Sequence, residues 1–463
     1  QVVSFLGIRY AEPPVGELRF KKPKKAKLLG GLMDTTKWAN SCFQPTDNNF
    51  GNFFGSNMWN PNTPMDEDCL FLNVFVPQQA LEGTTTQKLS VMIWIYGGGF
   101  YSGTSSLTMY DGKSLAASNG VIVVTINYRV GIWGFFGLGN SETPTNVGLW
   151  DQLLALEWVN THIHGFNGDP NSVTLFGESA GAVSVSLHLL SPLSWKYFNR
   201  AIMQSGTANM PWAVMTMNET IRRSKALVEA LNCNNSRNIA SEVKCMRDVS
   251  NDKIIDNQWV SRGFVQFPFG PTIDGEFVTE HPDELLRKGL FKKCPILLGS
   301  NANEASFFLI YEFGELLTLN SMKMSQKNAT DCINSVYNYY PQFPKIVPSD
   351  VLKAINFYYT HETEESAPDL EHFKNLDEAA SDGQFLCPLN EFSKAFVESD
   401  LPVYMYYFTE RLDNHLWPSY MGVLHADEIF FMFSDEIQTK IKFTERETGF
   451  SRLMSKLWAN FAK

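Results

Sequence analysis

The sequence predicts an α/β fold in which helices flank a large, mostly parallel sheet. Short apolar runs suited to buried strands alternate with longer segments that have helical spacing. The chain has 463 residues, of which 44% are hydrophobic, so it can bury a large core. We expect residues 1–463 to form a single catalytic domain. We also expect this domain to be truncated at both ends, because the sequence opens and stops in mid-pattern.

The expected elements follow in chain order. Strands are predicted at 91–96 and 121–130, a helix at 148–163, a strand at 172–177 and a helix at 180–190. The apolar runs at 294–300 and 402–408 are short enough to be further strands in the core of the sheet. Acidic, Asn-rich segments around 230–260 and 315–380 are interpreted as helical or loop insertions above the sheet.

Composition narrows the class of function. A formal net charge of −11 and a pI near 5.3 argue against nucleic acid as a partner, because nothing in this balance would neutralise phosphates. The sequence contains no run of 18 or more apolar residues. The seven cysteines show no metal-binding spacing, and His162 and His164 would face apart on a helix. We therefore expect neither a metal site nor a cofactor.

Cysteines and sequons point to an oxidising compartment. Cys42 with Cys69 and Cys233 with Cys245 are close enough in sequence to close surface loops. Three N-x-S/T sequons begin at the asparagines 218, 234 and 328. Together these features favour a secreted or extracellular protein.

The stretch TLFGESAGA, residues 174–182, carries the clearest chemical signal. Its core, Gly177 to Gly181, fits G-x-S-x-G, the sharp strand-to-helix turn that lifts a serine hydroxyl clear of a sheet. The match falls between a predicted strand and a predicted helix, where this mechanism requires it. The sequence therefore indicates Ser179 as a candidate nucleophile.

A nucleophilic serine also needs donors for an oxyanion, a base and an acid that orients the base. Three glycines, residues 97–99, follow a predicted strand directly and leave backbone N–H groups free, and the N–H of Ala180 would add another donor. With this turn the acid and then the histidine follow the serine along the chain. His425 suits the base because small residues flank it, with His415 as the competitor, and Glu304 is one candidate for the acid.

At WIYGGGFYSG, VTLFGESAGA and WPSYMGVLHADEIFF the sequence resembles the type-B carboxylesterase and cholinesterase family, and most closely its acetylcholinesterase branch. The likeness extends over nearly the whole chain. It implies the α/β-hydrolase fold, with insertions that form a gorge. It also implies Ser179 as nucleophile, His425 as general base and acid, and Glu304 as the orienting acid, with Gly98, Gly99 and Ala180 as the oxyanion hole.

The resemblance further implies a site for a choline ester. Trp59 matches the tryptophan that holds the quaternary ammonium group by cation–π attraction. The remaining implied substrate-binding residues are Tyr101, Tyr128, Glu178, Phe267, Phe307, Phe308 and Tyr311, and Asp47 and Trp259 match residues of the gorge rim. A small-molecule choline ester, acetylcholine in the first instance, is thus the expected substrate.

Some positions depart from the family pattern. Val265 stands where a second acyl-pocket phenylalanine is usual, which should leave room for larger acyl groups. Pro45 and Tyr420 replace a rim tyrosine and a tryptophan, and Ala426 and Asp427 follow the histidine where a glycine and an aromatic residue are usual.

The resemblance also bears on the cysteines and on the alternatives. It implies the disulfides Cys42–Cys69 and Cys233–Cys245, a partner for Cys387 beyond residue 463, and homo-oligomerisation or membrane anchoring through a segment absent from this sequence. A synaptic location would follow for an acetylcholinesterase. The alternatives are a carboxylesterase of broad range and, more remotely, a non-catalytic adhesion protein of the neuroligin type.

Overall fold

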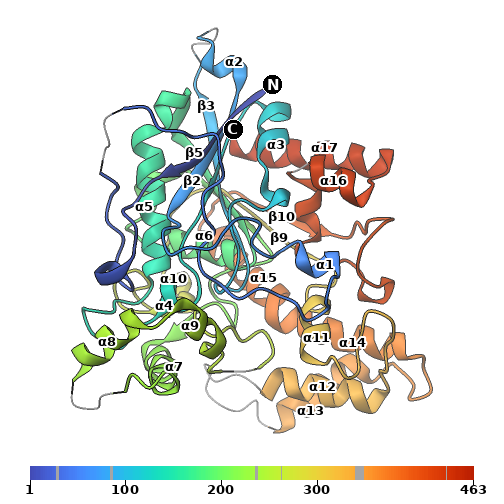
Figure 1. Ribbon diagram of the computed structural model, residues 1–463. Coiled ribbons are helices and arrows are strands. Elements are labelled where there is room, and N and C mark those ends of the chain that lie inside the picture. The colour runs from blue at the N-terminus through green and yellow to red at the C-terminus, as the bar shows by residue number, and fades with distance from the viewer. Residues whose placement is uncertain (28–30, 84–86, 235–237, 262, 339–348, 434) are drawn as a thin grey trace.

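The computed structural model describes residues 1–27, 31–83, 87–234, 238–261, 263–338, 349–433 and 435–463 (Figure 1). Within these residues eight strands form one sheet in the order β1-β2-β4-β3-β5-β6-β9-β10. The first two pairs of this order are antiparallel and the others are parallel. The strands are β1 Val2–Arg9, β2 Phe71–Pro77, β3 Leu89–Ile95, β4 Ile122–Ile126, β5 Gly168–Glu178, β6 Arg200–Gln204, β9 Ile296–Asn301 and β10 Val403–Phe408. This mostly parallel sheet confirms the predicted α/β fold.

The strands at the centre of the sheet are buried on both faces. All five residues of β4 are buried, as are the residues from Val91 to the end of β3. A strand covered on both faces cannot alternate polar and apolar side chains, which is why these segments read as continuous apolar runs. The registers bring the ends of β3 and β5 together, with Ile95 opposite Gly177.

The strand at 402–408 differs from its prediction. β10 lies at the edge of the sheet and not in its core, and its side chains Tyr404, Met405 and Tyr407 are 57%, 50% and 59% exposed. An apolar run of this length therefore marked a strand correctly but did not reveal its position in the sheet.

Helices cover both faces of the sheet (Figure 1). α3 Lys113–Asn119 and α17 Glu445–Ala462 pack together on one face. On the other lie α5 Val147–His162 and α6 Ala180–Leu190, joined where Gln152 Nε2 donates to Ser184 Oγ at 3.0 Å. The helix predicted at 148–163 and the strand-to-helix succession at 172–190 are thus confirmed.

The predicted insertions are largely helical and gather at the lower end of the molecule in Figure 1. The first includes α8 and α9, and the second includes α12, α13 and α14. In the first insertion, Asn235 and Ser236 of the sequon at Asn234 lie outside the described residues. A two-stranded sheet pairs β7 Met215–Thr216 with β8 Thr272–Ile273. The other helices are α1 Phe54–Asn57, α2 Gln78–Leu81, α4 Gly131–Phe135, α7 Met217–Ala230, α8 Ile239–Asp248, α9 Asn251–Asn257, α10 Pro282–Arg287, α11 Ser306–Glu312, α12 Gln326–Asn338, α13 Ser349–Thr360, α14 Asp369–Ser381, α15 Cys387–Val397 and α16 Asp435–Ile441.

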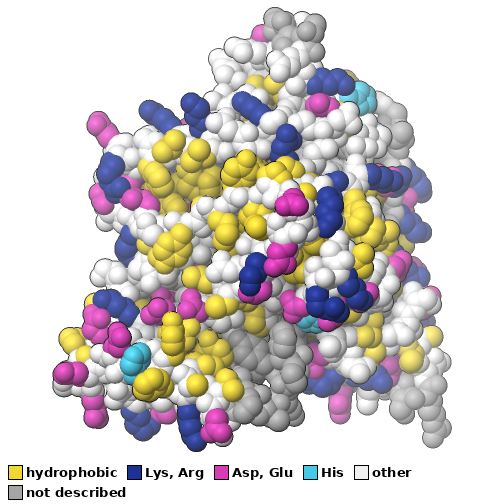
Figure 2. Space-filling view, turned by 180° about the vertical axis from the view of Figure 1, so that it is seen from behind, with side chains coloured by type: hydrophobic (Ala, Val, Ile, Leu, Met, Phe, Trp, Pro, Cys, Tyr) yellow, Lys and Arg dark blue, Asp and Glu magenta, His cyan; other side chains and the backbone are white. Residues whose placement is uncertain are grey.

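Seen from behind, the molecule carries several patches of hydrophobic side chains, between which basic and acidic side chains are interspersed (Figure 2). Among the described residues no helix combines the length and the apolar character needed to cross a bilayer.

Candidate active site

Ser179 stands at a sharp turn between β5 and α6. Its backbone angles, φ 55° and ψ −126°, are unusual for a residue that is not glycine, and its N–H donates to the carbonyl of Gln204 at 2.8 Å. Strand and helix approach so closely here that a Cβ on Gly181 would lie 2.0 Å from the carbonyl oxygen of Ile95. Because only glycine fits there, the G-x-S-x-G pattern has a direct steric cause.

Glu304 and His425, from loops that follow β9 and β10, form a buried pair. His425 Nδ1 lies 2.5 Å from Glu304 Oε2, and the other carboxylate oxygen, Oε1, accepts a hydrogen bond from the N–H of Asn301 at 2.7 Å. The acid is therefore fixed on its own loop while it orients the imidazole.

The second imidazole nitrogen faces a different carboxylate. His425 Nε2 lies 3.0 Å from Glu178 Oε1, but the angles do not make a hydrogen bond, and neither atom has another hydrogen-bond partner. Ser179 and His425 line the same cavity, but within the described residues no hydrogen bond joins Ser179 Oγ to the buried Nε2. In enzymes without substrate, catalytic hydrogen bonds are often long or poorly aligned and tighten on binding.

These carboxylates control the charge of the imidazole. Burial alone would lower the pKa of His425, but Glu178 and Glu304 outweigh burial and raise that pKa well above its ordinary value. Burial raises the pKa of Glu178, and the neighbouring imidazole offsets only part of this effect. His425 and Glu178 therefore compete for a proton beside Ser179.

The glycine run 97–99 lies against the serine. A Cβ on Gly97 would lie 3.0 Å from Ser179 Cβ and 2.7 Å from Glu178 Oε2. Gly98 and Gly99 have φ values of 105° and 58°, and a Cβ on Gly99 would lie 2.5 Å from the ring of Phe267. The loop can thus approach Ser179 closely only because it carries no side chains.

Ser179, His425, Glu178 and the glycines 97–99 border one cavity of about 510 Å³, within the size range of small-molecule sites. Of the residues predicted from the sequence, the cavity wall contains the following: Asp47, Trp59, Gly98, Gly99, Tyr101, Glu178, Ser179, Trp259, Phe267, Phe307, Phe308, Tyr311 and His425. Glu304 stands behind His425, and Ala180 begins the helix after Ser179. Val265 also lines the cavity.

Two predicted candidates lie elsewhere. Tyr128 was expected in the substrate wall, but it is fully buried beside the cavity, where its hydroxyl donates to the carbonyl of Tyr96 at 3.0 Å. His415, the competing base, has its Nε2 2.9 Å from both carboxylate oxygens of Asp427. It is held in this pair and is not paired with Glu304.

The structure also brings in residues that the sequence reasoning missed. Trp417 and Phe430 line the cavity and flank His425 in sequence, so the same loop argument could have found them. Asp427, which the sequence marked only as a departure from the family pattern, lines the cavity as well. Phe385 packs on His425 with ring centroids 5.1 Å apart, and it comes from a π-helical turn between α14 and α15. No local pattern pointed to Phe385, because only the tertiary fold brings it to the site.

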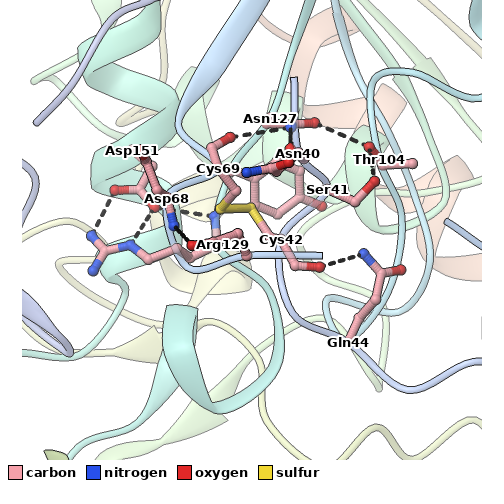
Figure 3. Close-up of a disulfide and its surroundings, with 12 residues drawn as sticks. Asn40, Ser41, Cys42, Gln44, Asp68, Cys69, Thr104, Asn127, Arg129 and Asp151 are labelled. Atoms are coloured by element: carbon pink, nitrogen blue, oxygen red, sulfur yellow. Dashed lines mark hydrogen bonds and ion pairs between the residues drawn. A yellow bond between two sulfur atoms is a disulfide. The ribbon is translucent and has the colours of Figure 1, made fainter. Parts of the chain in front are cut away.

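The loop that carries Trp59 and Asp47 is closed at its base by the disulfide Cys42–Cys69, which the structure confirms together with Cys233–Cys245. Figure 3 shows how the base is held: Asn127 Nδ2 donates to the carbonyls of Asn40 and Cys69 at 3.0 and 3.1 Å. Within the loop, Asp47 accepts a hydrogen bond from the hydroxyl of Tyr311. The loop is therefore held at its base by Asn127 and also tied to Tyr311 of the cavity wall.

The sheet order and the strand-to-helix turn at Ser179 define a protein of the α/β-hydrolase fold. Within this fold the chain belongs to the carboxylesterase family, whose model matches residues 1–463. It is a carboxylic ester hydrolase by this membership.

Several cholinesterases are similar to this chain along its whole length. A cholinesterase of Mus musculus is 43% identical over 466 residues, which cover 100% of this chain and 75% of that protein. Acetylcholinesterase 1 of Caenorhabditis elegans is 40% identical over 474 residues, with the same coverage of the two chains. An acetylcholinesterase of Electrophorus electricus is 39% identical over 495 residues, which cover 100% of this chain and 76% of that protein.

Proposed function

We propose that this protein hydrolyses choline esters through an acyl-enzyme formed on Ser179. The observation that carries the proposal is the charge and chemistry of the cavity wall. Its lining contains four carboxylates and, among the described residues, no Lys or Arg: the acids are Asp47, Glu178, Glu312 and Asp427. Its aromatic residues are Trp59, Tyr101, Tyr110, Trp259, Phe267, Phe307, Phe308, Tyr311, Trp417 and Phe430. Such a wall favours a cationic ligand with apolar methyl groups.

In the proposed mechanism the proton of Ser179 passes to Nε2 of His425 as the hydroxyl oxygen attacks the ester carbonyl. The N–H groups of Gly98, Gly99 and Ala180 are proposed to stabilise the negative oxygen of the tetrahedral intermediate. The C–O bond to the alcohol then breaks, and His425 gives its proton to the departing choline. Water, activated by the same imidazole, then hydrolyses the acyl-enzyme and restores Ser179. Glu304 keeps the ring in the tautomer that leaves Nε2 free to accept.

We further propose that Trp59 binds the ammonium group and that Phe267 and Val265 border the acyl group. Trp59 packs on Phe430 with ring centroids 6.3 Å apart, so the two rings form a continuous apolar wall. Val265 is smaller than phenylalanine, and we expect it to admit propionyl and butyryl esters as well as acetyl esters. Extracellular location is proposed on the two disulfides, which persist in oxidising compartments.

The experiment compares acetylthiocholine, butyrylthiocholine and phenyl acetate as substrates of the unmodified protein and of Trp59→Ala. A cation–π contact contributes about 0.5–2 kcal/mol. We expect Trp59→Ala to lower kcat/KM for the two choline esters by up to about thirtyfold more than for phenyl acetate. Trp158→Ala, at a partly buried indole outside the cavity lining, is the matched control. An equal loss on all three substrates would favour a carboxylesterase of broad range.

A further inference from the structure

Asp427 is a carboxylate in the cavity wall that the proposed reaction does not use. It begins a 3-10 helix, Asp427–Phe431, directly after the loop of His425, and only 3% of its surface is exposed. Its Oδ1 and Oδ2 each lie 2.9 Å from His415 Nε2, and Oδ2 also accepts the N–H of Leu424 at 2.8 Å. The carboxylate is therefore fixed in place, so its charge acts from one position.

The hydrogen bonds of His415 define the charge of this pair. His415 Nδ1 accepts the N–H of Trp417 at 3.1 Å, so the ring proton is on Nε2 and is donated to Asp427. A neutral imidazole satisfies both contacts, and the pair then carries one negative charge. Arg411 is the nearby cation, but its guanidinium donates to the carbonyls of Gly422, Trp417 and Pro418. Within the described residues Arg411 forms no ion pair with Asp427.

Asp427 belongs to the same part of the wall as the proposed ammonium site. Phe430 lies three residues further on in the 3-10 helix and packs on Trp59. Asp427, Phe430 and Trp59 all line the one cavity. A fixed negative charge thus borders the same cavity as the aromatic rings on which a cation would rest.

We propose that Asp427, held by His415, is a specificity-determining residue that makes the site prefer esters of a cationic alcohol over uncharged esters of the same shape. The inference deepens the proposed function and rests on it. A negative charge in the cavity wall favours a bound cation over an uncharged group of the same shape, and the positive charge of Arg411 weakens this preference. We expect Asp427 to account for about a fivefold to tenfold preference.

The test uses two substrates that differ only in charge: acetylthiocholine and 3,3-dimethylbutyl thioacetate, in which carbon replaces the ammonium nitrogen. The quantity measured is the ratio of their kcat/KM values. We expect Asp427→Asn to lower this ratio about fivefold to tenfold. His415→Gln keeps the carboxylate charged and offers it an amide donor, so it should keep the ratio within about twofold. Asp350→Asn removes one exposed charge on α13 and controls for the net charge of the molecule.

Each outcome decides the proposal. A ratio unchanged in Asp427→Asn overturns it, as does an equal fall in Asp427→Asn and His415→Gln, which would mean that the packing of the loop sets the ratio. Asp427→Ser, whose hydroxyl can accept from the N–H of Leu424, supplies a second uncharged variant if Asp427→Asn does not fold. If the unmodified protein shows no preference within the substrate pair, the proposed function itself fails. If it shows a preference that Asp427→Asn retains, only the present inference fails.

Discussion

Replacing Glu178 by glutamine should extend the activity of the enzyme into acid solution. Glu178 Oε1 lies 3.0 Å from His425 Nε2, and its charge is one of the causes that raise the pKa of His425. A histidine that acts as general base must be neutral, so activity is lost as the pH falls through its pKa. Removing a carboxylate that favours the imidazolium form lowers this pKa, and activity should persist at lower pH.

The distance sets the magnitude. Two unit charges 3.0 Å apart interact by about 1.4 kcal/mol at the dielectric constant of water and by about 5.5 kcal/mol at an effective dielectric constant of 20. Burial raises the pKa of Glu178 and so disfavours its charged form, and we therefore take the lower figure as the minimum effect. On the acid limb the variant should therefore retain about ten times more of its plateau kcat/KM than the unmodified protein does.

The assay follows kcat/KM against pH with phenyl acetate, a neutral substrate that avoids any effect of Glu178 on cation binding. Glu312→Gln is the matched control, because Glu312 also lines the cavity but is not among the groups that shift the pKa of His425. An acid limb that stays in place in Glu178→Gln, or one that moves to higher pH, would refute this reading of the electrostatics.

Three further predictions concern the scaffold. Replacing both Cys42 and Cys69 by alanine should lower the free energy of unfolding by about 3.5 kcal/mol, because the disulfide closes a loop with a sequence separation of 27. Denaturant titration of this double variant measures the loss of stability. Gly181→Ala should cost about 3 kcal/mol in the same titration, since the new Cβ would lie 2.0 Å from the carbonyl oxygen of Ile95, and an unchanged midpoint would contradict the close packing. Asp377→Asn should lower kcat about tenfold with KM largely kept, because this buried carboxylate accepts from residues on both sides of Glu304, the proposed orienting acid: Asn303 at 2.7 Å and Ser306 at 2.9 Å. A loss confined to KM would contradict this prediction.

The buried centre of the fold could be predicted because the signal lies within each strand's own sequence. Strands covered on both faces must be apolar throughout, and the run at 91–96 shows this directly. The place of β10 could not be predicted in the same way. Its apolar side chains are compatible with either the core or the edge, and only the neighbours in the finished sheet decide which of the two it occupies.

The residues of the candidate site also differ in whether a local sequence pattern reveals them. The turn at Ser179 could be predicted because it restricts the neighbouring positions to small residues, and the chain order then suggested a histidine after it as the proposed base. Phe385 could not be found, since its contact with His425 depends on how α14 and α15 pack. Tyr128 shows the limit of a resemblance: the residue type matches the pattern, but its hydroxyl donates to the backbone at Tyr96 and does not face the cavity.

The central claim is that Ser179 carries the acyl group. An organophosphoryl fluoride transfers its phosphoryl group to an activated serine, and peptide mass mapping locates the adduct. We predict one adduct per chain, on Ser179, formed in step with the loss of ester hydrolysis and absent from Ser179→Ala. An adduct on another residue, or hydrolysis that continues after complete modification of Ser179, would contradict the account.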